Sequence, residues 1–92
     1  MKTLDNKRFL LGTNEVQYSE LIKTCLNNVP QGGFTPQEMK ERMKILDVLE
    51  TANGTIELED ADAKKMKDCV KQMKWGLLDK NLIEFIDSVE KL

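Results

Sequence analysis

The chain of 92 residues contains no histidine, and this absence removes the commonest catalytic base. It also removes the usual zinc ligand and every nucleophile arrangement built on a Ser–His or Cys–His pair. Gly32-Gly33 is not followed by Lys-Ser or Lys-Thr, as a phosphate-binding loop of the usual type requires. We therefore expect a protein that is not an enzyme and that holds no cofactor or metal.

The densest group of acidic residues is Glu57, Glu59, Asp60 and Asp62. Clustered carboxylates can bind a divalent cation, but the Asp-x-Asp-x-Asp-Gly pattern of a calcium loop is absent. Each residue also has a structural use, because the glutamates alternate along an expected strand and the aspartates begin an expected helix. The structural use is the favoured interpretation.

Lysines recur at helical spacing in the second half of the chain, as Lys64, Lys67, Lys71 and Lys74. Between residues 63 and 80, six lysines stand against two aspartates, a local excess of +4 in a chain of net charge −2. A charge run on a helix is usually a solvated face, and that interpretation comes first here. A contact with an acidic protein surface comes second. Nucleic acid comes third, because arginine, the residue best suited to base edges, is absent from the stripe.

Trp75 follows the lysine stripe and has two possible orientations. On an unbroken helix it would point toward the lysine side, where an exposed indole can anchor a protein partner. If Gly76 bends the chain, the indole instead folds back onto the core, as is commoner for tryptophan. Trp75 and the four lysines form the candidate partner-binding set.

Cys25 and Cys69 each fall within an apolar helical pattern, which favours core thiols in a reducing compartment over a disulfide. No apolar run approaches the roughly 18–20 residues needed to cross a bilayer. At the N-terminus, charges flank a three-residue apolar run, unlike a signal peptide. We expect a cytoplasmic protein without a membrane partner.

Helices and strands must position these residues, and the most clearly marked of them is a helix that begins at Thr35. Thr35 has the character of an N-cap, Pro36 suits the first helical position, and Glu38 can complete a capping box. Phe34 and Met39 occupy the two positions of a hydrophobic staple. The segment predicts a helix over 36–52, ended by a left-handed residue at Asn53-Gly54. Its apolar residues cover more than half of the helical circumference, so it is expected to be the central helix, packed on two sides. These residues are Met39, Met43, Ile45, Leu46, Val48, Leu49 and Ala52.

The other elements follow from periodicity and turn residues. Alternation predicts strands at Lys7–Leu11 and Glu15–Tyr18, with a competing helix that runs from Asn14 to Asn28. Helical patterns cover 19–28, 61–75 and a segment that starts at about Asp79, and alternation predicts a strand at 55–59. That strand needs a partner, and the N-terminal hairpin is the one candidate.

The expected fold is therefore a helix-dominated α+β single domain over 1–92, in the order β-β-α-α-β-α-α, with a small antiparallel sheet against the central helix. The alternative is an all-α fold. Within the domain, residues 1–29 form the hairpin and first helix, 30–34 a loop, and 35–92 the helix-strand-helix-helix part.

No motif is specific enough to name a family. The size, the missing catalytic groups and the self-contained fold resemble small accessory proteins of bacteriophages and other mobile elements. The leading hypothesis is a non-catalytic protein-protein interaction module, an adaptor, inhibitor or assembly subunit. Self-association is an option through the last helix, whose apolar stripe more often packs within its own chain. That stripe comprises Leu82, Phe85, Ile86, Val89 and Leu92. The alternative is a nucleic-acid-binding regulator that uses the lysines of helix 61–75.

Overall fold

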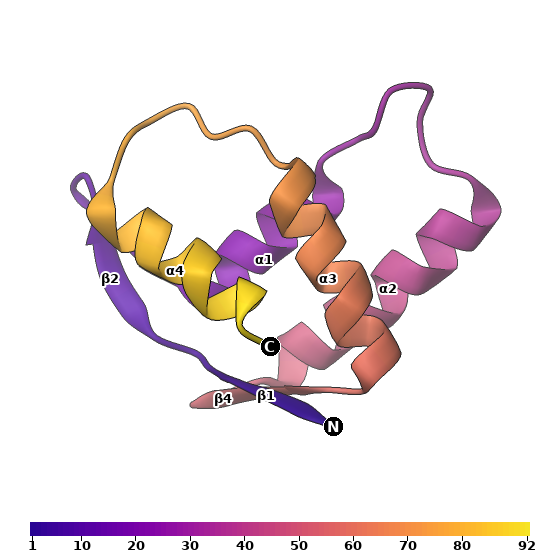
Figure 1. Ribbon diagram of the computed structural model, residues 1–92, viewed down its shortest axis with the longest axis horizontal. Coiled ribbons are helices and arrows are strands. Elements are labelled where there is room, and N and C mark those ends of the chain that lie inside the picture. The colour runs from indigo at the N-terminus through magenta and orange to yellow at the C-terminus, as the bar shows by residue number, and fades with distance from the viewer.

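Four helices and two separate two-stranded antiparallel sheets make up the computed structural model, which describes residues 1–92 (Figure 1). The elements in chain order are β1 (Lys2–Asp5), β2 (Arg8–Leu11), β3 (Asn14–Gln17), α1 (Tyr18–Asn27), α2 (Pro36–Thr51), β4 (Thr55–Leu58), α3 (Asp60–Gln72) and α4 (Lys80–Glu90). The helix-dominated α+β class is confirmed, and the all-α alternative is wrong. One strand more is present than the sequence pattern predicted, because β1 precedes the hairpin.

Strand β4 pairs with β1. The sequence pattern had predicted that it pairs with the hairpin. Leu4 lies opposite Ile56, and both side chains are buried, as is Leu58 on the same face of β4. The expected alternation of β4 is thus confirmed, whereas the expected pairing is wrong. Strand β1 escapes prediction because Leu4 is its one apolar residue, so no alternating pattern marks it.

The hairpin β2–β3 turns through Gly12 and Thr13, with Leu11 paired to Asn14. Gly12 has a φ of +67°, and no residue other than glycine has a positive φ. A positive φ at the first turn position alone is typical of the type II′ turn, whose twist matches that of a hairpin. The two expected strands are confirmed to within a residue or two, and the competing helix from Asn14 is wrong.

Asn6 joins three parts of the chain that are distant in sequence. Its side-chain oxygen accepts from the backbone N–H of Ser19 at 2.9 Å, in the first turn of α1. Its side-chain nitrogen donates to the Gln17 side chain at 3.0 Å and to the Asn53 backbone carbonyl at 2.8 Å. A remote side chain therefore supplies a hydrogen bond that a local cap usually makes at a helix start.

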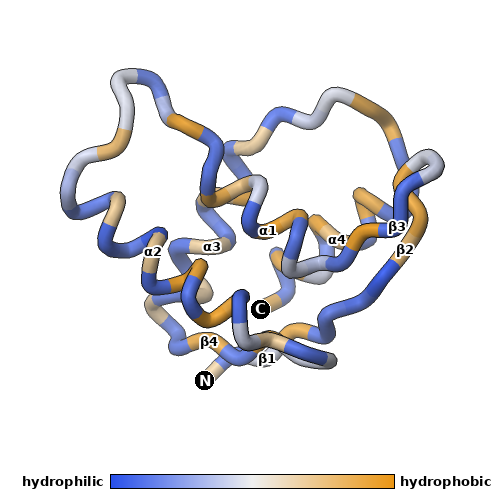
Figure 2. The backbone as a smooth tube through the Cα atoms, turned by 180° about the vertical axis from the view of Figure 1, so that it is seen from behind, coloured by the Kyte–Doolittle hydropathy of each residue, from blue (hydrophilic) through white to orange (hydrophobic).

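The core lies among α1, α3, α4, the inner side of α2 and the inner face of the β1–β4 sheet. Figure 2 shows hydrophobic and hydrophilic residues alternating along the helices, as expected for elements with one buried face. A series of edge-to-face aromatic contacts crosses the core. The ring centres of Phe9 and Tyr18 are 6.1 Å apart, those of Tyr18 and Phe85 5.0 Å, and those of Phe85 and Trp75 6.3 Å. Phe85 of α4 is fully buried, so the apolar stripe of α4 packs within its own chain.

Helix α2 is not the central helix, because only Arg42, Ile45 and Leu49 of it are buried. It lies at one side of the molecule, and Met39 and Met43 are 52% and 54% exposed (Figure 1). The wide apolar arc reveals which residues could be buried but not whether another element covers them. The expectation of packing on two sides is therefore wrong.

The helix ends agree only in part with the sequence pattern. The hydroxyl of Thr35 accepts from the Glu38 N–H at 3.1 Å, so the predicted N-cap of α2 is confirmed. Helix α4 begins next to Asp79, as expected, and the Asp79 side chain caps it by accepting from two backbone N–H groups. The N-cap position of α3 is Glu59 and not Asp60, the Glu59 side chain makes no capping hydrogen bond, and the helix ends at Gln72. Helix α2 ends through an extended Ala52, without a left-handed Gly54. No helix is both long enough and apolar enough to span a bilayer.

Candidate protein-interaction site

Helix α3 carries three of the four candidate lysines, beside its buried face. Met66 and Val70 face the core, whereas Lys64 and Lys71 are exposed. Lys67 is half-buried, and its ammonium group donates to the main-chain oxygen of Leu92 at 3.3 Å. The spacing of three and four residues places Lys64, Lys67 and Lys71 on one face of the helix. Lys74 lies beyond the helix end and is also exposed.

The candidate lysines differ from Lys65 and Lys44 in having no acidic side chain as a partner. No aspartate or glutamate carboxylate lies within 4.0 Å of the ammonium group of any of the four. By contrast, Lys44 contacts Glu59 at 3.1 Å and Asp62 at 3.4 Å, and its hydrogen bond to Glu59 raises the pKa of Lys44. Asp60 contacts the N-terminal amine at 3.5 Å. Three of the four clustered acidic residues are thus used in internal pairs, whereas the lysine charge remains free of acidic side chains.

Trp75 packs against the core and does not stand on the lysine side. The indole is half-buried and meets the ring of Phe85 edge-to-face at 6.3 Å. The chain leaves the helix after Gln72, so the turn back occurs before Gly76 and not at it. Replacing Trp75 would therefore disturb the core together with any contact to a partner.

Two leucines that follow Trp75 are exposed in its place. Leu78 is fully exposed and Leu77 is 45% exposed, in the loop between α3 and α4. Figure 2 shows a hydrophobic stretch in the part of this loop that precedes α4. The sequence offered one sign, two adjacent leucines between Gly76 and the helix cap Asp79, outside any helical period. These leucines and the four lysines together form the lysine–leucine surface, which comprises Lys64, Lys67, Lys71, Lys74, Leu77 and Leu78.

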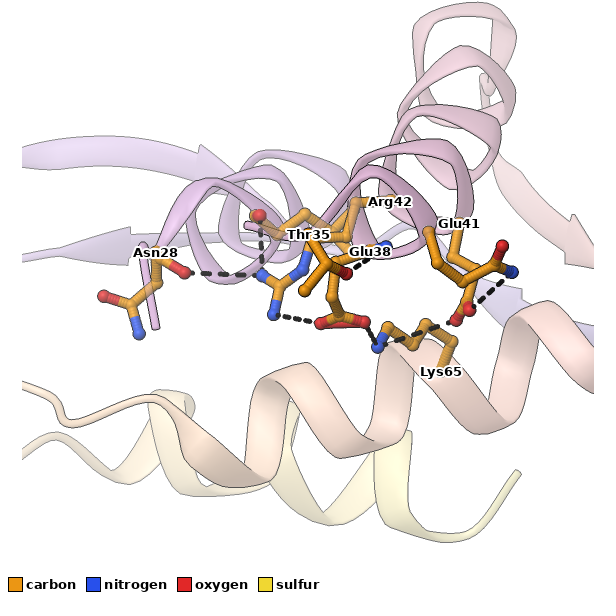
Figure 3. A network of polar contacts seen from close by, with 8 residues as sticks. Asn28, Thr35, Glu38, Glu41, Arg42 and Lys65 are labelled. Atoms are coloured by element: carbon orange, nitrogen blue, oxygen red, sulfur yellow. Dashed lines mark hydrogen bonds and ion pairs between the residues drawn. The ribbon is translucent and has the colours of Figure 1, made fainter. Parts of the chain in front are cut away.

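A second charged group lies between α1, α2 and α3 and is centred on the buried Arg42 (Figure 3). One guanidinium nitrogen donates to the backbone carbonyls of Leu26 at 2.8 Å and Asn28 at 3.3 Å. Another donates to the Glu38 carboxylate at 3.3 Å, and the group lies 4.9 Å from the centre of the Phe34 ring. Arginine therefore closes the C-terminal end of α1, whose last carbonyls lack helical partners.

Glu38 extends this network to α3 through an ion pair with Lys65. The hydrogen bond from Lys65, followed by that from Arg42, lowers the pKa of Glu38, and Glu38 in turn raises the pKa of Lys65. Glu41 lies 3.6 Å from the same ammonium group. Glu38 does not reach back to the Thr35 N–H, so the expected capping box is wrong. Arg42, Glu38, Glu41 and Lys65 form the Arg42 network, which joins three helices.

An open apolar groove of about 220 Å³ lies beside this network, between the end of α1 and the outer edge of α2. The sequence favoured core packing for methionines in general but allowed Met39 and Met43 to line a docking groove, and the structure leaves both at the surface. We call it the methionine groove. It is lined by Leu26, Asn27, Phe34, Met39, Arg42, Met43 and Leu46.

The two cysteines are free thiols inside the core, on α1 and α3. Burial raises the pKa of Cys25 to about 12 and also raises the pKa of Cys69. Both thiols are thus protonated at neutral pH, and the thiolate is the form that attacks electrophiles and binds metals. The cysteines serve packing, as the sequence pattern favoured.

Comparison with known proteins gives no relative from which a function can be transferred. No protein-family model matches the chain, no curated protein matches it, and no solved structure matches it. The function must therefore be argued from the surfaces of this molecule.

Proposed function

We propose that this protein is a non-catalytic interaction module that binds an acidic surface of another protein through the lysine–leucine surface. The observation that supports the proposal most directly is Leu78, which is fully exposed in a loop that follows the unpaired lysines. Large apolar side chains exposed singly are common, but here two adjacent leucines stand between Lys74 and Lys80, both exposed.

The chemistry of the surface specifies the partner. Burying an exposed leucine gains about 1.5–3 kcal/mol, so Leu77 and Leu78 can act as an apolar anchor in a recess of the partner. Lysines around an anchor favour an acidic rim, because complementary charge speeds association and rejects basic surfaces. The partner we propose is a protein with a small apolar recess bordered by aspartate and glutamate.

The free thiols support a reducing compartment for this module, since paired cysteines are the rule outside it. We propose the cytoplasm as its location. Adaptors, inhibitors and assembly subunits all act by such contacts.

The test is affinity capture from an extract of the source cells, read by mass spectrometry, with matched variants. Leu77→Ser with Leu78→Ser removes the anchor, and Lys71→Glu with Lys74→Glu reverses the charge. Leu10→Ser on β2, where the leucine is 62% exposed, and Lys23→Glu with Lys91→Glu are the controls elsewhere. Proteins lost with both test variants and kept with both controls support the proposal. A wild-type capture that the test variants reproduce in full contradicts it.

A nucleic-acid-binding regulator is the second candidate, and the absence of acidic side-chain partners at Lys64, Lys67 and Lys71 of α3 favours it. Free ammonium groups on one helix face can contact phosphates. The candidate ranks below protein binding because no arginine lies on this face and the net charge is −2. It predicts a mobility shift of generic duplex or single-stranded DNA that weakens steeply with salt and is lost in Lys67→Glu with Lys71→Glu. No shift at low salt excludes it.

A further inference from the structure

The outer edge of α2 beside the methionine groove is apolar and uncovered by any part of this chain. Met39 and Met43 are 52% and 54% exposed, and Leu46 is half-buried one turn further on. Lys40 and Asp47 are exposed on the same edge, and neither forms an ion pair. The edge therefore combines an apolar centre with free charges of both signs, since Glu50, one turn after Leu46, is also exposed and unpaired.

The order of these residues is self-complementary. Lys40 and Asp47 lie seven positions apart, close to two full turns, so they point to the same side about 10.5 Å apart. Met43 lies between them. An antiparallel second copy, related by a two-fold axis near Met43, places each Lys40 against the Asp47 of the other chain. Met39 then lies close to Leu46 of the other copy. A parallel copy in register would instead bring lysine level with lysine, so the charges select the antiparallel arrangement.

We propose that a second copy of this chain occupies the methionine groove in a symmetric antiparallel dimer across α2. A symmetric dimer uses one surface twice, and it needs a patch that is complementary to itself, as this edge is. Methionine side chains adapt to each other easily, which suits an interface formed by two identical groups. The dimer is independent of the lysine–leucine surface, so each proposal can fail without the other.

The first experiment is sedimentation equilibrium of the whole chain over a range of concentrations up to about 1 mM, the weak end of specific affinity. We expect a reversible dimer that Met43→Asp converts to monomer with an unchanged circular dichroism spectrum. Met43 is exposed, so its replacement should leave the fold intact, and the spectrum checks this. A wild-type chain that stays monomeric throughout overturns the proposal.

Charge reversal at the two ends tests the register. Lys40→Glu and Asp47→Lys, each alone, should weaken dimerisation by about tenfold or more, because like charges then face each other. An equal mixture of the two single variants should dimerise again, since positions 40 and 47 then carry opposite charges in both contacts between the chains. The double variant should recover by itself for the same reason.

Lys91→Glu is the control for these reversals and should dimerise like the wild type. A dimer that ignores both reversals overturns the antiparallel register, and so does a mixture that stays monomeric.

Discussion

Two neighbouring lysines of α3 have opposite surroundings, and they represent the two charged regions of this molecule. The Lys65 side chain is 21% exposed and forms ion pairs with Glu38 and Glu41 in the Arg42 network. Lys64 is exposed and has no carboxylate within ion-pair distance. They are about 100° apart on the helix, so one residue step separates a charge used for the fold from a charge left free.

The difference in surroundings implies a difference in what each region does. In the Arg42 network, removing one charge leaves half-buried partners unpaired, which lowers the free energy of unfolding. On the lysine–leucine surface, removing a charge leaves no acidic side chain unpaired, so the fold should not depend on it. The following variants test this contrast, from the largest expected effect to the smallest.

Arg42→Ala should be the most destabilising change, at about 2–4 kcal/mol, because it leaves two backbone carbonyls and the Glu38 carboxylate without their donor. The melting temperature should fall by more than about 10 °C in a domain of this size. Arg42→Lys should lie between this variant and the wild type, since lysine keeps the charge and loses the planar fork. A melt of Arg42→Ala equal to that of the wild type would show that the network contributes nothing to stability.

Glu38→Gln should cost about 1–2 kcal/mol at pH 7, because it removes the acceptor of two cationic donors. The loss should depend on pH with a defined sign. The pKa of Glu38 is lowered below its ordinary 4.5 in the folded protein, so its stabilisation is complete above that pH. It is lost as the pH falls through the lowered value. Urea unfolding of the wild type and Glu38→Gln should therefore converge as the solution is acidified below about pH 4.5. A constant difference down to about pH 2 would contradict the assignment.

Thr35→Ala should cost about 0.5–1 kcal/mol, because it removes the hydroxyl that accepts from the Glu38 N–H at the start of α2. Thr35→Ser keeps that acceptor and is the matched control. Thermal unfolding followed by circular dichroism measures both. Equal melting temperatures of Thr35→Ala and Thr35→Ser would show that the cap does not contribute to stability.

Much of the fold could be predicted from local chemistry. The caps at Thr35 and Asp79, the alternation of β4 and the hairpin around Gly12 depend on neighbouring residues, and all four are present. The pairing of β4 could not be predicted, because β1 carries a single apolar residue. Its place in the sheet depends on a contact more than 50 positions away in sequence.

The sequence indicated the four lysines of the candidate site but not its two exposed leucines. The lysine periodicity indicated the exposed face of α3, since charged side chains show which side of a helix meets water. Packing of Trp75 onto the core was the favoured orientation and is confirmed, whereas the helix predicted to run to residue 75 is too long, because it ends at Gln72 without a glycine or proline to mark it. Leu78 was missed, and α2 was expected to be packed on two sides, for a related reason. Sequence reports that a residue is apolar, whereas exposure depends on which elements pack against it.

The contrast between the two regions is tested most directly by Lys71→Glu with Lys74→Glu, measured for both stability and partner capture. We expect a melting temperature within about 3 °C of the wild type, since exposed unpaired charges change stability by less than about 0.5 kcal/mol. The same variant should lose the proteins that the wild type captures from an extract of the source cells. Unchanged capture would contradict the account, and so would a melt lowered as far as that of Arg42→Ala, because these lysines would then hold the fold together.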